Sequence, residues 1–184
     1  MYSIIAFTFR SYSQPLLLFL MIPFCLVGVA WGHWIHGFPL SMLSTLGIIA
    51  LIGILVNDGL VLVSKFNGFL KEGMPFEEAL YEAGRSRFRA IMLTSITTVA
   101  GLAPLILETA RSAQFLIPMA ITIVYGIAYA TLLTLFMLPL FLYFSNSIKI
   151  GRVWLFTGEK VGRRDVERAV TEELVEEEAV KHIY

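Results

Sequence analysis

Four long runs of apolar residues divide the chain, and each is long enough to cross a lipid bilayer as a helix. They cover residues 15–35, 40–64, 90–107 and 115–144. A helix needs about 20 apolar residues to span a hydrocarbon core of roughly 30 Å. The last run is longer than this, so we expect it to tilt or to project from the bilayer. The pattern predicts an all-α integral membrane protein with four complete transmembrane helices.

A shorter apolar run, YSIIAFTF at residues 2–9, precedes the first of these spans. As a helix it would cover roughly 12 Å, which is less than half of the hydrocarbon core. No basic segment precedes it and no A-x-A-like site follows it, so it does not resemble a secretory signal. We interpret it as the end of a truncated transmembrane helix.

The basic residues lie almost entirely on one side of this predicted topology. Of the 14 lysines and arginines, only Arg111 lies in a connection on the opposite side. The two connections on that side, HGFPL and ETARSAQ, are short. Because basic residues concentrate on the cytoplasmic side of membrane proteins, we expect both termini in the cytoplasm.

The connection between the second and third spans predicts a short amphipathic helix at the cytoplasmic surface. Its apolar residues have helical spacing: Phe76, Ala79, Leu80 and Ala83. Pro75 suits the start of such a helix and Gly84 its end. A plain connecting segment with one solvated face explains the same pattern equally well.

The tail, residues 146–184, changes to a charged composition. Four of its apolar residues have helical spacing: Val166, Ala169, Val170 and Leu174. We expect a cytoplasmic tail that is helical in part.

The composition favours a membrane protein and gives no sign of a cofactor. Hydrophobic residues make up 57% of the chain, charged residues only 15%, and the net charge is zero. We therefore expect the lipid bilayer, and no nucleic acid, as a partner. Cys25 is the only cysteine, which leaves no disulfide framework and no zinc cluster. No nucleophile–base pair or phosphate-binding loop is visible, so we expect no enzyme, no metal site and no cofactor.

Asn57 and Asp58 stand side by side in the apolar segment IIALIGILVNDGLVLVS. An aspartate at the centre of a span costs roughly 2.5–3.5 kcal/mol on insertion scales, and such residues commonly mark ion paths or proton relays. Asp58 lies on the cytoplasmic side of the centre of its predicted span, so its carboxylate could also reach the interface by snorkelling. Asn57 can donate and accept hydrogen bonds beside it without a charge.

The third span carries several hydroxyl groups in its cytoplasmic half. The segment LTSITT contains Thr94, Ser95, Thr97 and Thr98. Thr94 and Thr98 share one helix face because they are four residues apart. Such hydroxyls can hold two helices together or take part in a relay with Asp58, and the sequence leaves both open.

In the first span, Gly28 and Gly32 form GVAWG, a G-x-x-x-G pattern that permits close approach of helices. The pattern is common in membranes. One alternative for the whole chain is therefore a small, non-transporting membrane module that binds a partner through this motif and its acidic tail.

Taken in order, several segments resemble one family of transporters. They are FRSYSQPLLLFLMIPF, GILVNDGLVLV, EGMPFEEALYEAGRSRFRAIMLTSITTVAGLAPL and QFLIPMAITIVYGIAYATLLTLFMLP. Over roughly residues 1–145 the chain resembles the C-terminal membrane portion of a resistance-nodulation-division (RND) efflux permease, of the hydrophobe/amphiphile or acriflavine-resistance type.

The resemblance implies a proton-driven multidrug antiporter of the bacterial inner membrane. Permeases of this family are usually homotrimers with twelve spans in two repeated halves, and they work with a periplasmic adaptor and an outer-membrane channel. The spans here would be the ninth to the twelfth. The N-terminal half and the porter domains, which bind substrate, would lie outside this chain, so we expect a fragment that is not competent alone. Branches of the superfamily that export lipids or metals are alternatives.

The resemblance also implies site residues. The relay lysine of well-studied relatives falls at Asn57, so that charge is absent here. Asp58 falls where those relatives often have asparagine, although VND resembles one subgroup. The relay threonine matches Thr94, and a functionally important arginine matches Arg87. These four residues are our candidates for the proton path.

Overall fold

The computed structural model of the protein describes residues 13–111, 113–157, 162–163, 165–167 and 170–171. It contains the helices α2 (Ser13–His36), α3 (Met42–Lys71), α4 (Phe76–Ile106) and α5 (Ile117–Thr157). Each of these helices is long and apolar enough to cross a membrane. For the described part of the chain, the prediction of an all-α protein with four spanning helices is confirmed. The apolar run at residues 2–9 lies outside the described residues.

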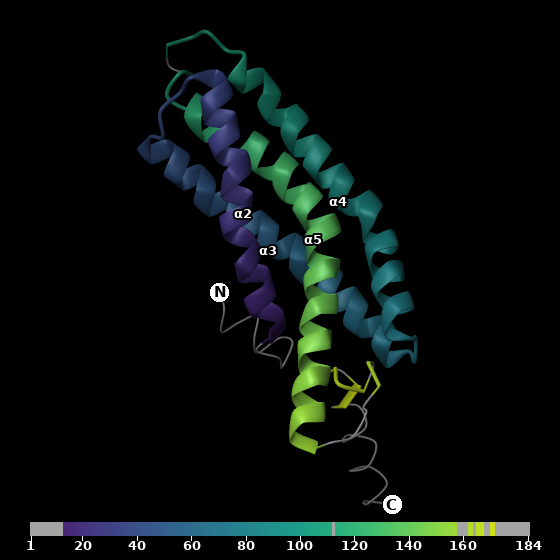
Figure 1. Ribbon diagram of the computed structural model, residues 1–184. Helices are drawn as coiled ribbons and strands as arrows, with labels where there is room; N and C mark the ends of the chain where they lie inside the picture. The colour runs from purple at the N-terminus through teal and green to yellow at the C-terminus, as the bar shows by residue number, and fades with distance from the viewer. Residues whose placement is uncertain (1–12, 112, 158–161, 164, 168–169, 172–184) are drawn as a thin grey trace, which may run out of the picture.

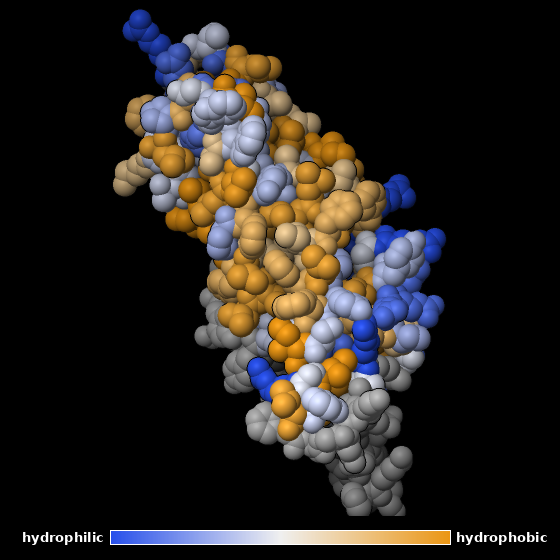
Figure 2. Space-filling model, viewed as in Figure 1, coloured by the Kyte–Doolittle hydropathy of each residue, from blue (hydrophilic) through white to orange (hydrophobic). Residues whose placement is uncertain are grey.

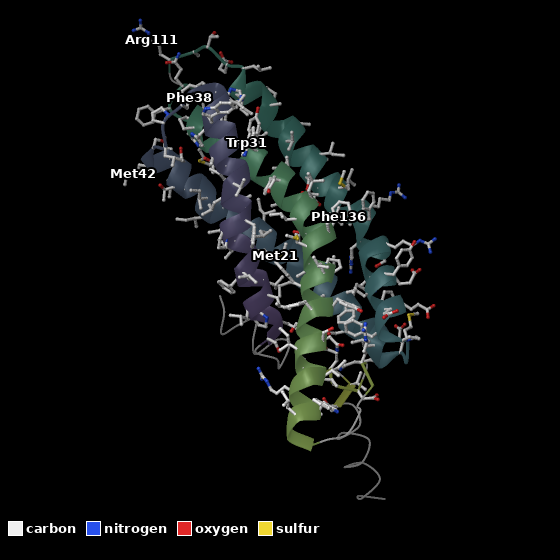
Figure 3. The ribbon with its side chains drawn as sticks, viewed as in Figure 1. Met21, Trp31, Phe38, Met42, Arg111 and Phe136 are labelled. Carbon is white, nitrogen blue, oxygen red and sulfur yellow. The ribbon has the colours of Figure 1, made fainter. Side chains whose placement is uncertain are left out.

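The four helices run alternately up and down, and α5 lies at the centre of the bundle. Figure 1 shows the α2–α3 and α4–α5 connections at one end and the α3–α4 connection at the other. Helix α5 packs against each of the other three helices. Arg111 lies at the tip of the first end, in the α4–α5 connection (Figure 3). We refer to this end of the bundle as the Arg111 end.

Local sequence explains where α2 ends and where α3 begins. Gly37 has a φ of 65°, a conformation that glycine adopts without steric cost, and it ends α2. The Phe38 amide donates to the His33 carbonyl and the Gly37 amide to the Trp34 carbonyl, which is the Schellman pattern. Ser41 then caps α3 in a reciprocal capping box with Ser44.

Two helix boundaries differ from the sequence prediction. The separate short helix expected over residues 76–83 is instead the first two turns of α4, which continues through Gly84 without a break. Glycine in a helix interior costs only about 1 kcal/mol relative to alanine, so it need not end a helix. Helix α5 likewise continues past the expected end of the last span, at residue 144, as far as Thr157. The first residues of the expected tail thus extend the last membrane helix.

The tail is only partly described. Val170 is buried in the core cluster, whereas Ala169 and Leu174 lie outside the described residues. The expected tail helix is therefore described only at isolated positions.

The surface of the bundle is apolar around its middle. Figure 2 shows hydrophobic residues across the centre of the visible face and hydrophilic residues towards both ends. Large apolar side chains are well exposed on this surface, among them Trp31, Leu93 and Phe136. Trp31 lies near the Arg111 end of α2, and Phe136 lies on the α4-facing side of α5 (Figure 3). An apolar band with polar ends matches the cross-section of a bilayer.

Candidate proton-relay site

The polar pair of α3 lies near the middle of this 30-residue helix. Asn57 is exposed on the surface of the bundle and Asp58 is half-buried. Their neighbours Val56 and Gly59 are buried, and Gly59 lies against Leu18 of α2. Within the described residues, neither Asn57 nor Asp58 makes a side-chain hydrogen bond or an ion pair. A carboxylate in this position therefore has no compensating partner in the described part of the chain.

The hydroxyl groups of α4 divide into two kinds. Thr94 donates to the Ala90 carbonyl at 3.0 Å, and Thr97 and Thr98 also donate to carbonyls of their own helix. The buried Ser95 instead forms a short hydrogen bond across the bundle with Thr131 of α5. Of the two roles left open by the sequence, that of holding helices together fits Ser95. The Thr94 side chain stays accessible on the exposed face of α4.

Arg87 lies two turns before Thr94, so both project from similar sides of α4. The arginine side chain is half-buried, and its Nε atom is buried without a hydrogen-bond partner in the part of the chain that the structure describes. An arginine donor without a partner is unusual, because buried polar groups are normally hydrogen-bonded.

The structure places the four candidates on two helices that pack against each other, but it does not join them. No hydrogen bond or ion pair links Asn57, Asp58, Thr94 and Arg87 among the described residues. Asn57 and Thr94 are both exposed, which means that they face away from the core of this bundle. In the same residues, no three His, Cys, Asp or Glu side chains lie together where they could hold a metal ion.

Gly28 and Gly32 lie in a close contact between α2 and α5. A Cβ atom added to Gly28 would lie 2.9 Å from the Tyr125 carbonyl oxygen, and one added to Gly32 would lie 2.6 Å from Cγ of Tyr125. Both glycines are buried. The G-x-x-x-G face of α2 is therefore occupied by α5 of the same chain.

Two further polar contacts between helices were not predicted from the sequence. Gln14 of α2, only 4% exposed, exchanges two amide hydrogen bonds with Asn67 of α3, at 2.9 and 3.0 Å. His33 bonds to Thr122 of α5. In each contact the partners are far apart in the sequence, so no local pattern pairs them. For the second contact the available signal was a pair of polar residues, His33 and Thr122, inside apolar runs, whereas Gln14 and Asn67 lie just outside the runs.

Comparison with known proteins identifies the family. Residues 1–146 match the AcrB/AcrD/AcrF family. The chain is 34% identical over 131 residues to the cobalt-zinc-cadmium resistance protein CzcA of Cupriavidus metallidurans, covering 71% of this chain and 12% of that protein. It is 31% identical over 160 residues to the multidrug resistance protein MdtC of Erwinia tasmaniensis, covering 86% of this chain and 16% of MdtC.

A third relative is the swarming motility protein SwrC of Bacillus subtilis, 32% identical over 140 residues, which are 76% of this chain and 13% of SwrC. The chain thus spans less than a fifth of the length of each of these relatives. The family match covers most of the chain and confirms the resemblance to RND permeases. This chain belongs to the AcrB/AcrD/AcrF family.

Proposed function

We propose that this chain is the C-terminal membrane portion of a proton-driven exporter of the bacterial inner membrane, and that it acts as a transporter component and not as an enzyme. The observation that carries the proposal is Asp58, a half-buried carboxylate near the middle of the apolar α3, without a partner in the described residues. Membership of the family supports export as the overall activity. An ionisable group at this depth is most useful where it exchanges a proton.

Asp58 would bind a proton in one state of the transporter and release it in another. The neutral carboxylic acid is far less costly in an apolar layer than the carboxylate, so proton binding would favour a state that buries this part of α3. Asn57 beside it can donate or accept a hydrogen bond in both states. The proton would enter and leave along the side of the bundle on which Asn57 is exposed.

Thr94 and Arg87 of α4 would flank this path. The Thr94 hydroxyl already donates to Ala90, so its oxygen can accept a further hydrogen bond. Arg87 has an Nε donor without a partner among the described residues, and its charge would stabilise a carboxylate supplied from elsewhere in the transporter. Both side chains therefore have capacity for partners beyond the described residues.

We propose amphiphilic compounds as the exported substrates, as the name of MdtC suggests for that relative. Export of divalent metal ions is the second candidate, because CzcA, named for cobalt, zinc and cadmium resistance, is at least as similar. Expression of the full-length protein in an efflux-deficient bacterium distinguishes these two candidate substrate classes. Amphiphile export predicts greater resistance to dyes and detergents, whereas metal export predicts greater resistance to cobalt, zinc or cadmium alone.

The remaining parts of the proposal concern assembly. The rest of the permease would supply an N-terminal half and porter domains, and three copies would associate and work with a periplasmic adaptor and an outer-membrane channel. Both ends of this chain would lie in the cytoplasm, with the Arg111 end of the bundle outside. Cysteine labelling from outside the cell tests this orientation. The cysteine of Arg111→Cys should react with the labelling reagent, and that of Gly73→Cys should not.

Accumulation of a fluorescent substrate in cells tests the relay. Asp58→Asn should raise accumulation to the level of cells without the transporter, while Asp58→Glu should keep part of the export activity. Immunoblotting must find equal amounts of both variants in the membrane. Wild-type export by Asp58→Asn would reject the relay role of Asp58.

A further inference from the structure

An open groove lies between the first half of α4 and the middle of α5. Residues of α4 within 77–88 line one wall, and residues of α5 within 135–139 line the other. The volume of the groove is about 630 Å³. Phe136 lies on the α4-facing side of α5 (Figure 3) and is 73% exposed. The two helices are joined closer to the Arg111 end, through Ser95 and Thr131, and leave a space here.

Gly84 keeps the α4 wall of the groove open. It lies inside α4, and a Cβ atom added to it would meet no atom within 4 Å. Alanine would therefore fit at this position, and it is more favourable than glycine in a helix interior. Packing within the described bundle gives no reason for a glycine here. A ligand that lies against this part of α4 does give one, because glycine lets a ligand approach the backbone closely.

The two walls of the groove differ in polarity. The α5 wall belongs to an uncharged run over residues 115–148. On α4, Arg89 is the last charged residue before an uncharged run over residues 90–107. Figure 2 shows hydrophilic residues bordering the apolar band along the edge that the first half of α4 forms. A groove with an apolar wall and a charged edge matches a phospholipid, whose acyl chains and headgroup meet at the same boundary.

The charged edge of the groove is positive. Arg85, which lines the groove, and Arg89, one turn later, are both exposed, and like charges four residues apart repel each other. In the part of the chain that the structure describes, Arg85 has one ion-pair partner, Glu82 at 3.1 Å, and Arg89 has none. An exposed pair of this kind contributes roughly 0–1 kcal/mol, so a phosphate could replace Glu82. Guanidinium groups bind phosphate through paired N–H donors.

The carboxylate that lines the groove does not oppose an anion. Glu77 lies at the start of α4 and forms an ion pair with Arg163 at 2.9 Å. Its negative charge is therefore offset at that end of the groove.

We propose that this groove binds an anionic phospholipid. One acyl chain would lie along Phe88 and Phe136, and the phosphate would bind the guanidinium groups of Arg85 and Arg89. Basic pockets between membrane helices bind anionic headgroups on the cytoplasmic side, where the proposed orientation puts this end of the bundle. A helix from the rest of the permease would also cover the groove, but acidic residues that could pair with two arginines are rare in membrane helices. The inference does not depend on export, because its test detects lipid.

Photo-crosslinking in the full-length protein identifies the occupant. Phe136 is replaced by p-benzoylphenylalanine, and the protein is irradiated in nanodiscs of phosphatidylcholine with a minor fraction of phosphatidylglycerol. Mass spectrometry of the peptide that contains residue 136 should find adducts of phosphatidylglycerol, enriched several-fold over the share of this lipid in the nanodisc. A crosslink to another segment of the permease, or adducts in the bulk lipid ratio, would overturn the proposal.

Charge variants carrying the same crosslinker test the phosphate contacts. Arg85→Gln combined with Arg89→Gln should abolish the enrichment of phosphatidylglycerol, because no guanidinium group remains to select the anionic headgroup. Arg111→Gln, which removes a positive charge at the opposite end of the bundle, should leave the enrichment unchanged. Equal enrichment in the double variant and in Arg111→Gln would show that the two arginines do not bind the headgroup.

Glycine variants carrying the same crosslinker test the groove itself. Gly84→Leu should fill the groove and lower the yield of lipid adducts several-fold. Gly101→Leu is the matched control on the same helix, since a Cβ there also meets nothing within 4 Å, and it should keep the full yield. Thermal unfolding shows that both variants are folded. An undiminished yield of phosphatidylglycerol adducts in folded Gly84→Leu protein would contradict the assigned site.

Discussion

Gly32 of α2 lies against the ring of Tyr125 of α5, so closely that a Cβ atom at Gly32 would be 2.6 Å from Cγ of the tyrosine. Gly28, one turn earlier, lies against Tyr125 and Tyr129 in the same way. Heavy atoms do not approach so closely without displacement. The absence of side chains at these two positions is therefore what allows α2 to reach the central helix.

Enlarging either glycine should separate α2 from α5. We expect Gly28→Leu and Gly32→Leu to lower the free energy of unfolding by about 2 kcal/mol or more, because overpacking of this kind forces the backbone to shift. Thermal unfolding in detergent measures the loss. Gly68→Ala is the matched control, since a Cβ at Gly68 meets nothing within 4 Å. Equal stability of Gly32→Leu and Gly68→Ala would contradict the observed packing.

The reciprocal amide contact between Gln14 and Asn67 should be measurable as a coupling energy. Gln14→Leu and Asn67→Leu should each destabilise the protein, because each leaves one amide without its partner. The double variant should be less destabilised than the sum of the single variants by about 1 kcal/mol, in the range of hydrogen bonds between membrane helices. Unfolding of the four proteins of this cycle gives the coupling directly. Simple additivity would show that the two amides do not depend on each other.

Ser95 and Thr94 are adjacent on α4 but should respond differently to loss of the hydroxyl. Ser95→Ala removes the bond to Thr131 and should lower the free energy of unfolding by about 1 kcal/mol, with export per molecule retained. Thr94→Ala removes only a bond within α4, so stability should change little, whereas proton-coupled export should fall. Parallel unfolding and transport assays compare the two variants. The reverse pattern would assign the relay to Ser95.

A buried ion pair holds the segment after α5 against the bundle. Glu167 is 4% exposed and accepts hydrogen bonds from Asn146 at 2.9 Å and Lys149 at 2.8 Å. Glu167→Ala removes the acceptor of Lys149 and one of the two acceptors of Asn146, whose amide also donates to the Arg163 carbonyl at 2.8 Å, so the segment should be held less tightly against α5. We expect limited proteolysis after residue 157 to become at least several-fold faster.

The control for this prediction is the exposed ion pair between Glu77 and Arg163, at 2.9 Å. Exposed pairs of this kind contribute roughly 0–1 kcal/mol, so Glu77→Gln should leave the cleavage rate nearly unchanged. If both variants are cleaved at the wild-type rate, the Glu167 contacts do not hold the segment in place.

The spanning helices were predictable because an apolar layer forces backbone groups to bond within a helix, whatever lies around them. Their ends were less predictable. Gly84 suggested an end to a helix, yet residues on both sides of it favour helix strongly enough for α4 to continue. The end of α5 at Thr157 also lies well beyond the apolar run, because no proline follows that run within α5 and the helix continues through Gly151.

The candidate site was predictable only in part, because the sequence shows which residues are polar but not which residues they contact. Asp58 is conspicuous in an apolar run, so its position was evident from the sequence alone. The hydrogen-bond partners of Ser95, His33 and Gln14 could not be predicted from the sequence. Each partner lies on another helix, so the contact depends on how the helices are rotated when they pack. The capping of α2 by Gly37 is local, yet the contact that it creates between Phe38 and His33 becomes visible only in three dimensions.

The central claim, that Asp58 takes part in proton-coupled export, is tested most directly in proteoliposomes. The full-length protein is reconstituted, a pH gradient is imposed, and substrate movement and proton movement are recorded together, with Asp58→Glu as the matched control. We predict that Asp58→Asn slows both movements by about tenfold or more, equivalent to at least about 1.4 kcal/mol in the barrier. Coupled transport by Asp58→Asn at the wild-type rate would contradict the claim.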